Sequence, residues 1–303
     1  MKIRIGYGLG TQTTAARPAA FGRLVDDLER LGFDSLWLSE RVTGAAPDPL
    51  VGLAFAAGRT TELKLGTSVL VIPGRNPVLL AKELASLDVL SGGRLLPAFG
   101  LGVADPAEQQ AFGVDRSERA AWFDEALALI RQLWRGEPVD HDGRFRYRGL
   151  QIQPRPTQSR PDVWLGGIAP SELRRVGRLA DGWLPSFVTP AEAAAGRVKI
   201  EEVARASGRA IDPEHFGALI AYARGPLPDR FVTAMAARRP GVDPASLVPA
   251  GVRRLRETVE AFAERGTSKF VLVPLNEPAD WTTELEELAA ALLVLQSAGT
   301  GPG

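Results

Sequence analysis

The sequence lacks cysteine entirely and holds only two histidines among its 303 residues. The absence of cysteine excludes disulfides, thiol nucleophiles and thiolate metal ligands. The two histidines, His141 and His215, fall on different predicted elements and show no metal-ligand spacing. We therefore expect neither a metal site nor a Ser-His triad.

An excess of charge of either sign is also missing. Lys plus Arg and Asp plus Glu both number 36, so the net charge is zero. This balance argues against a nucleic-acid binder and against electrostatic binding to a membrane. No uncharged apolar run is long enough to cross a bilayer, and Met1-Lys2 leads into a predicted strand rather than a signal peptide. We therefore expect a cytoplasmic protein.

The sequence does contain a clear strand–helix–strand pattern in the stretch Leu63–Gly102. Leu63–Val71 and Arg94–Phe99 are continuously apolar, which is typical of parallel strands buried on both faces. Between them, Asn76-Pro77 supplies an N-cap and a first helical residue, and leucines follow at helical spacing. Both strands end in small residues, which let a ligand approach the main chain at the carboxyl edge of the sheet.

The same unit recurs along most of the chain. Apolar strands are predicted at Lys2–Leu9, Phe33–Ser39, Leu63–Val71, Arg94–Phe99, Asp162–Leu165, Asp181–Leu184, His215–Ala223 and Ser268–Val273. Eight strands, each followed by a helical pattern, predict an α/β fold of the (β/α)8 barrel type. A doubly wound open sheet is the alternative, but eight alternations fit closure better. We expect residues 1–298 to form one domain and 299–303 to be a disordered tail.

Three segments depart from this alternation and predict loop insertions at the carboxyl end of the barrel. Val103–Arg116 reads as a polar loop, and Asp142-Gly143 predicts a hairpin within Pro138–Gln153. Arg224–Ala250 is rich in Pro and Arg and reads as an insertion with one short helix. We expect the first and third of these segments to shape a substrate pocket.

Several short stretches in a fixed order resemble a known family. They are Gly66–Leu70, Arg75-Asn76-Pro77, Leu87–Arg94, Gly100-Leu101-Gly102, Phe112-Gly113, Gly166-Gly167 and Ala180–Trp183. The set is similar to the bacterial luciferase-like superfamily, and nearest to its F420-dependent oxidoreductase branch. This resemblance implies a homodimer whose barrel mouth binds FMN or the deazaflavin F420.

The resemblance also implies roles for particular residues. Ser68 and Val69 would be joined by a cis peptide against the cofactor ring. The phosphate would be cradled by the main chain of Gly166, Gly167, Ile168 and Ala169, as bare amides beside a helix start allow. The remaining cofactor-binding residues at this edge would be Gly8, Gly100, Leu101 and Gly102.

Two positions depart from the family's pattern. Many F420-dependent dehydrogenases have Asp-His where this chain has Glu40-Arg41. Arg41 cannot act as a base, so we expect it to bind an anionic substrate or polarise a ring carbonyl, with Glu40 hydrogen-bonding the ring edge. Val103 stands where the sugar-phosphate dehydrogenases have a catalytic Glu, which argues against a glucose-6-phosphate reaction. Arg174 and Arg175 could reach a cofactor phosphate from the helix start, but they fit a solvated helix face better.

The resemblance therefore predicts an oxidoreductase that transfers hydride between F420 and a small organic substrate. One alternative is an FMN-dependent monooxygenase supplied with reduced flavin by a separate flavin reductase. Another is a non-catalytic protein that binds flavin or deazaflavin, which the absent His and Glu motivate. A cofactor is needed in either enzyme because side chains do not carry hydride.

Overall fold

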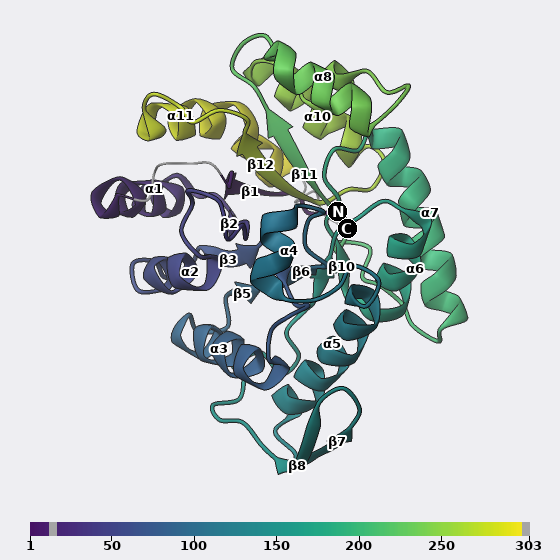
Figure 1. Cartoon of the computed structure of the whole chain (residues 1–303). Helices are drawn as coiled ribbons and strands as arrows, with labels where there is room; N and C mark the ends of the chain where they lie inside the picture. Colours follow the sequence, from purple (N-terminus) through teal and green to yellow (C-terminus); the bar gives the residue numbers. More distant parts are fainter. Residues whose placement is uncertain (12–16, 299–303) are drawn as a thin grey trace.

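The computed structural model describes residues 1–11 and 17–298, and it has a ring of parallel strands surrounded by helices (Figure 1). The parallel strands are β1 (Arg4–Leu9), β2 (Ser35–Leu38), β3 (Lys64–Thr67), β4 (Leu70–Val71), β5 (Leu95–Leu96), β6 (Ala98–Gly100), β9 (Trp164–Leu165), β10 (Gly182–Trp183), β11 (Gly217–Tyr222) and β12 (Lys269–Pro274). The predicted tail at 299–303 lies outside the described residues.

The strand pairings join eight strand positions in a ring. One sheet has the order β11-β12-β1-β2-β3-β5 and the other has the order β10-β9-β6-β4. The chain runs directly from β3 into β4 and from β5 into β6, so each pair occupies one position in the ring. A parallel bridge between Trp183 and Phe216 joins β10 to the start of the β11 position. The predicted (β/α)8 barrel is confirmed.

The outer layer consists of helices whose starts follow the predicted capping signals. They are α1 (Pro18–Leu31), α2 (Pro49–Ala57), α3 (Pro77–Leu90), α5 (Arg119–Arg135), α6 (Pro170–Leu179), α7 (Pro190–Ala206), α10 (Val252–Ala263) and α11 (Trp281–Leu288), which continues through a π-helical turn (Ala289–Leu293) into α12 (Val294–Ala298). Asp48 and Asn76 accept hydrogen bonds from main-chain N–H groups of their first turns, and Thr189 forms a capping box with Glu192. These local signals therefore set the starts of α2, α3 and α7.

Two tryptophans fill the interior of the barrel. Trp37 and Trp164 belong to one buried cluster with Ala98, Leu184 and Val271. Each ring faces a glycine: a Cβ at Gly66 would lie 2.3 Å from the Trp37 ring, and a Cβ at Gly182 would lie 2.5 Å from Trp164 Cδ2. The barrel is thus a packed core, and a ligand is restricted to its ends.

The segments between the repeating units differ in part from the sequence expectation. The hairpin is present as β7 (Val139–Asp142) and β8 (Arg146–Leu150). The expected polar loop contains α4 (Pro106–Phe112), and the expected single helix of 224–250 is two, α8 (Asp229–Arg238) and α9 (Pro244–Leu247). Those expectations were wrong because Asp105-Pro106 and Asp243-Pro244 repeat the capping device of the outer helices.

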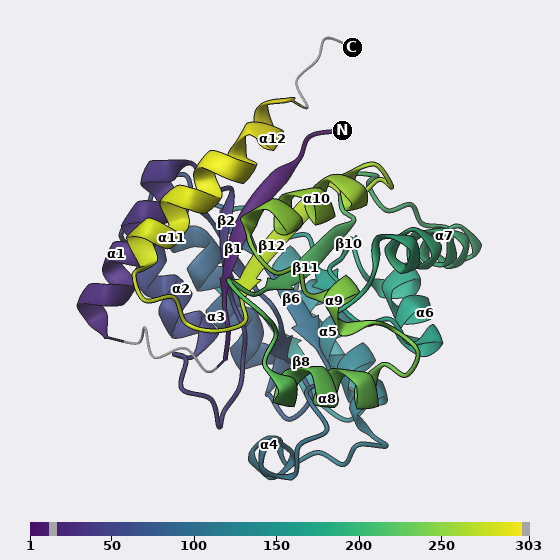
Figure 2. The same ribbon diagram turned by 90° about the horizontal axis from the view of Figure 1, so that it is seen from above.

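The two extra helical segments lie at one end of the barrel. Figure 2 shows α4 and α8 on the side away from the amino terminus, which is the side where the strands end. Within the described ranges, none of the helices has the length and apolar character that a membrane crossing requires. The insertions are therefore placed to surround the carboxyl ends of the strands.

Candidate active site

The peptide between Ser68 and Val69 is cis, as the resemblance implied. It separates β3 from β4. The two residues that follow β2 donate hydrogen bonds to the carbonyl oxygens of both residues of this peptide. The Ser39 hydroxyl donates to the Ser68 carbonyl oxygen at 2.7 Å, and the Glu40 N–H donates to the Val69 carbonyl oxygen at 3.1 Å. The predicted strand Leu63–Val71 is therefore interrupted, and this interruption turns Val69 toward the mouth of the barrel.

A cavity of about 250 Å³ opens at this end of the barrel. Of the residues predicted for the cofactor, its lining includes Glu40, Ser68, Val69, Gly100, Leu101, Gly102, Gly166 and Gly167. Other walls are apolar and come from Phe99, Phe123, Leu165, Leu184 and Leu219. A Cβ at Gly100 would lie 2.5 Å from Val69 Cγ2, so glycine is required for Val69 to take its place.

Four predicted site residues are not part of that lining. Gly8 is buried within β1, where a Cβ would lie 2.8 Å from Val273 Cγ2. Arg41 points to α4, with Nη2 3.2 Å from Asp105 Oδ2 and Nε 3.8 Å from Glu108 Oε1. Ile168 and Ala169 follow the lining residues Gly166 and Gly167 and begin the turn into α6. Arg41 thus ties the loop after β2 to α4.

Glu40 lies at the edge of the cavity with its side chain 4% exposed. Its carboxylate accepts a hydrogen bond from the Val71 N–H at 2.6 Å and pairs with Arg75. Burial raises the pKa of Glu40, although the Val71 N–H and the Arg75 charge act in the opposite direction. The Glu40 carboxylate is therefore engaged by the Val71 N–H and by Arg75. It positions β4 and is not free to act as a base.

Glu108 is a lining residue that the sequence did not assign to the site. It is buried on α4 and accepts hydrogen bonds from the Thr43 hydroxyl at 2.7 Å and the Thr43 N–H at 2.8 Å. Burial opposes its ionisation, but the bonds from Thr43 and Val42 and the charge of Arg41 lower the pKa of Glu108. The signal that was missed is Asp105-Pro106, which starts α4 and places Glu108 in its first turn.

The predicted phosphate loop meets an acidic side chain of the same protein. Glu172 Oε2 accepts hydrogen bonds from the Ile168 N–H at 2.9 Å and the Ala169 N–H at 2.8 Å. A Cβ at Gly167 would lie 2.5 Å from Glu172 Cδ. The loop lies at the cavity as predicted, but two of its amides already bind an anion.

Arg175 also faces this cavity instead of a solvated surface. Its side chain is 15% exposed, and its Nε donates to Asp124 Oδ1 at 2.7 Å. The expectation of a solvated helix face was therefore wrong for Arg175, because its side chain pairs with Asp124 of α5 and lies over the Phe123 ring. Within the described residues, every charged side chain that lines the cavity has a polar partner. These side chains are Glu40, Glu108, Glu172 and Arg175.

Residues 2–229 match the family described as luciferase-like monooxygenase. The chain belongs to this family. An F420-dependent glucose-6-phosphate dehydrogenase from Kineococcus radiotolerans is 33% identical over 196 residues, which cover 60% of this chain and 56% of that protein. A phthiodiolone/phenolphthiodiolone dimycocerosates ketoreductase from a Mycobacterium species is 32% identical over 217 residues, which cover 61% and 56%. The chain thus spans about half the length of the curated relatives it matches.

Several solved structures have a fold similar to that of this chain. A monooxygenase from Streptomyces bottropensis superposes with a TM-score of 0.78 at 23% identity, covering 96% of this chain and 99% of that one. The F420-dependent tetrahydromethanopterin reductase from Methanopyrus kandleri gives 0.77 at 20% identity, covering 97% and 99%. At these identities the superpositions support the luciferase-like barrel itself.

The glycine loop of this luciferase-like cleft is supported from behind by a buried arginine. Arg119 is 5% exposed, and its Nη1 donates to the carbonyl oxygens of Val103 at 3.1 Å and Leu101 at 3.4 Å. Gly102 adopts a φ of +83°, which favours glycine. Arg119 therefore holds the conformation of the loop that lines the cavity.

Proposed function

We propose that this luciferase-like protein is an oxidoreductase that binds F420 and transfers hydride between the deazaflavin and a small organic substrate. The observation that carries the proposal is the cavity at the carboxyl ends of the strands, whose walls are largely apolar and whose charged residues are paired within the protein. Glycine at positions 100 and 166 leaves space that a Cβ would restrict, with approaches of 2.5 Å to Val69 and 3.2 Å to the Leu184 carbonyl. Such a space suits a flat ring, and curated relatives are F420-dependent dehydrogenases by name.

The residues that line the cavity suit the ring system of the cofactor better than they suit its phosphate group. Ser68, Val69, Gly100, Leu101 and Gly102 would hold the ring through main-chain atoms and apolar contact. Gly166 and Gly167 would face the side chain of the cofactor. The N–H groups of Ile168 and Ala169 become available only when Glu172 leaves them.

The bound deazaflavin would supply a carbon that accepts or donates hydride. The chain itself would position the substrate and exclude water, because the carboxylates at the cavity are bound to N–H groups, hydroxyls or arginines. No free general base faces the cavity from the described part of the chain. We therefore propose that positioning and electrostatics, rather than a side-chain base, lower the barrier.

We further propose that the substrate is uncharged and is not glucose 6-phosphate. Val103 is apolar and 45% exposed at the cavity, where the resemblance places a Glu in sugar-phosphate dehydrogenases. Arg41, the expected ligand for an anionic substrate, is engaged by Asp105 and Glu108. An anionic substrate would lose its hydration without gaining a free cation.

Titration of the purified protein with F420 and with FMN tests the cofactor proposal. Quenching of ligand fluorescence should show F420 binding with a dissociation constant at least about tenfold below that for FMN. Tight binding of FMN without F420 would replace the proposal with the FMN-dependent monooxygenase, which would also need a flavin reductase. Tight F420 binding with no change in deazaflavin absorbance across a panel of alcohols and carbonyl compounds would indicate the non-catalytic alternative.

We propose that two copies associate through α2 and α3, which are neighbouring helices (Figure 1). The α2 sequence PLVGLAFAA has no charged residue, yet Val51 is 69% and Phe55 is 40% exposed. On α3, Leu79 is 61% and Leu90 is 76% exposed. A helix that is apolar all round, as α2 is, is normally covered, and a second copy would cover α2 together with the exposed leucines of α3. We also propose a cytoplasmic location.

A further inference from the structure

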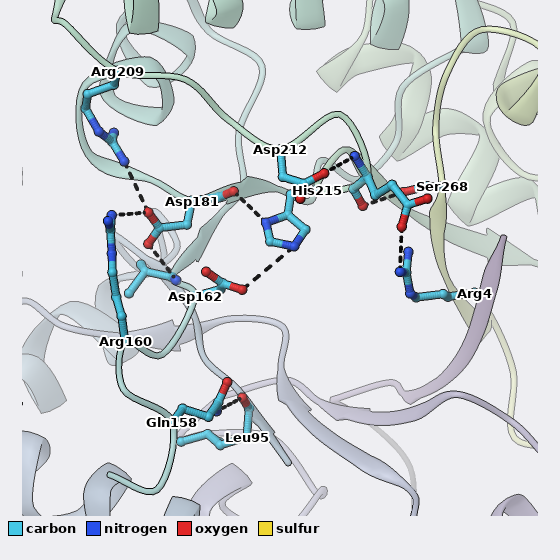
Figure 3. A network of polar contacts seen from close by, with 12 residues as sticks. Arg4, Leu95, Gln158, Arg160, Asp162, Asp181, Arg209, Asp212, His215 and Ser268 are labelled. Carbon is cyan, nitrogen blue, oxygen red and sulfur yellow. Dashed lines mark hydrogen bonds and ion pairs between the residues drawn. The ribbon is translucent and has the colours of Figure 1, made fainter. Parts of the chain in front are cut away.

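A second cavity, of about 220 Å³, lies at the opposite end of the barrel from the candidate active site. Its lining includes the first residues of three strands, Arg4, Lys64 and Lys269, together with Trp164 and His215. Figure 3 shows this end, with Arg4, Asp162 and His215 among its polar side chains. Nothing in the proposed hydride transfer uses this cavity, so the following inference does not depend on that function.

Two lysines at this cavity share a single carboxylate. Lys64 Nζ lies 3.2 Å from Asp34 Oδ1, and Lys269 Nζ pairs with Asp34 Oδ2. Neither lysine has another carboxylate partner among the described residues. Lys269 is 3% exposed, and burial lowers its pKa from 10.5 to about 8, so it remains charged at neutral pH. One positive charge is therefore left without a counter-ion.

Arg94 adds a further cation to the cavity lining. Its guanidinium donates to the main-chain carbonyl oxygens of Ala57, Thr60, Leu63 and Ser91 and to the Thr60 hydroxyl. Among the described residues it forms no ion pair, and Glu29 and Glu62 act on it only through space. The charge of Arg94 is therefore hydrogen-bonded but not neutralised.

The acids of the cavity do not balance these cations. Glu214 forms an ion pair with Arg4, whose Nη2 lies 2.6 Å from Glu214 Oε2. His215 Nδ1 donates to the Asp181 main-chain carbonyl at 3.1 Å, which leaves Nε2 facing Asp162 Oδ2 at 3.7 Å (Figure 3). The cavity lining therefore holds four basic side chains, Arg4, Lys64, Arg94 and Lys269, and two acidic ones, Asp162 and Glu214. Three further carboxylates act on these cations from outside the lining: Asp34 on the two lysines, and Glu29 and Glu62 on Arg94. Within the lining itself, basic side chains exceed acidic ones.

Trp164 supplies a hydrogen-bond donor that has no acceptor. The residue lines the cavity and is 2% exposed, and its indole Nε1 is buried without a hydrogen-bond partner. The indoles of Trp37, Trp134 and Trp183 all donate to oxygen atoms of the protein, whereas Trp122, which does not line this cavity, shares the unpartnered state of Trp164. A buried N–H without an acceptor costs free energy, and an acceptor atom from a ligand would remove that cost.

We propose that this cavity binds a phosphate group, either as the free anion or as a small phosphate ester. Lys64 and Lys269 would supply the charged donors, because they share the single carboxylate of Asp34. Arg94 would add only its charge, because all five of its N–H groups already donate within the protein. A tetrahedral oxyanion has acceptor oxygens in several directions, which suits donors that come from different strands. The site is separate from the cofactor cleft and lies at the amino ends of the strands.

Calorimetric titration of the full chain with inorganic phosphate tests the proposal, with sodium chloride holding the ionic strength constant. We expect one phosphate to bind per chain, and Lys64→Gln to weaken binding about tenfold or more. Lys64 is 42% exposed on its side chain, so the variant should fold. Lys64→Arg keeps the charge and should bind phosphate like the wild type. Lys199→Gln, an exposed variant on α7, is the matched control and should also bind normally.

A second readout follows the indole N–H of Trp164 by nuclear magnetic resonance. The resonance that disappears in Trp164→Phe identifies this group, and it should shift when phosphate is added to the wild type. Glycerol 3-phosphate tests the ester: tighter binding than inorganic phosphate assigns the site to an ester, and weaker binding assigns it to the free anion. Equal phosphate affinity in the wild type and Lys64→Gln, or an unshifted Trp164 resonance at saturation, would overturn the proposal.

Discussion

The Glu172 carboxylate accepts a hydrogen bond from the Ala169 N–H at 2.8 Å, at the start of α6. The same oxygen accepts from Ile168 at 2.9 Å, so it occupies both amides that precede the helix. The N-terminus of a helix favours an anion because its N–H groups and dipole point outward. In this protein, the anion that occupies that position is a side chain of α6 itself.

Glu172→Gln should therefore strengthen the binding of cofactors that carry a phosphate relative to the same ring systems without it. The neutral amide no longer repels a phosphate, and it still accepts a hydrogen bond that caps the helix. We expect the dissociation constant of riboflavin divided by that of FMN to rise about fivefold or more. The dissociation constant of the phosphate-free deazaflavin divided by that of F420 should rise in the same way. Fluorescence titration measures both ratios.

A matched control exists on the next helix. Glu192 occupies the same capping-box position on α7 and does not line the cavity. Glu192→Gln replaces the same kind of capping carboxylate by an amide and should leave both ratios unchanged. If Glu172→Gln and Glu192→Gln give the same ratio as the wild type, Glu172 does not compete with the phosphate.

Gly100→Ala should weaken cofactor binding while the barrel remains folded. The added Cβ would lie 2.5 Å from Val69 Cγ2, so Val69 must move within the cavity. Overpacking of this kind costs about 1–3 kcal/mol, which corresponds to about tenfold or more in affinity. Gly58→Ala is the control, because its Cβ would meet no atom closer than 3.7 Å and its φ is −74°. Fluorescence quenching measures binding. If Gly100→Ala binds the cofactor as tightly as the wild type, the ring does not lie against Val69.

Asp34→Asn should destabilise the fold strongly. The substitution removes the carboxylate that Lys64 and Lys269 share and leaves Lys269 buried without a counter-ion. Removing one partner of a buried ion pair costs about 3–5 kcal/mol. Urea denaturation at neutral pH measures the loss. Asp26→Asn, which breaks an exposed pair with Arg59, should cost less than about 1 kcal/mol.

The stabilisation from Asp34 should depend on pH in the acid range. Burial raises the pKa of Asp34, but Lys269 and Lys64 outweigh burial and lower it from 3.8 to about 2. Between these values the unfolded chain binds a proton that the folded chain does not, so acid favours unfolding. The advantage of the wild type over Asp34→Asn should be full above about pH 5 and shrink by about 2 kcal/mol as the pH falls toward 2. A pH-independent difference would contradict this assignment.

Val51→Glu should convert a dimer into monomers. A charge on the apolar face of α2 would have to be buried against the second copy, which costs more than the contact contributes. Light scattering after size-exclusion chromatography should show half the wild-type mass. Val198→Glu is the control, because Val198 is 56% exposed on α7. A monomeric wild type, or an unchanged mass for Val51→Glu, would refute the α2–α3 interface.

Much of the fold was predictable because its signals are local. Asp48-Pro49, Asn76-Pro77 and the capping box of Thr189 start helices where they were predicted. The strand break at Ser68–Val69 came from resemblance rather than from any local pattern, since nothing in the apolar run Leu63–Val71 marks it. The short helix α4 was missed although Asp105-Pro106 carries the same capping signal.

The sequence by itself determined the order of strands and helices, because capping residues and apolar runs act within a few residues of one another. It also placed the small residues of Gly100–Gly102 and Gly166-Gly167 at the carboxyl edge of the barrel. Only the tertiary structure decided which charged groups meet there and at the opposite end. Glu108 reaches Thr43 from 65 residues away, and Lys269 reaches Asp34 from 235 residues away. Such pairs follow from the register of the paired strands and the packing of α4, which no local signal encodes.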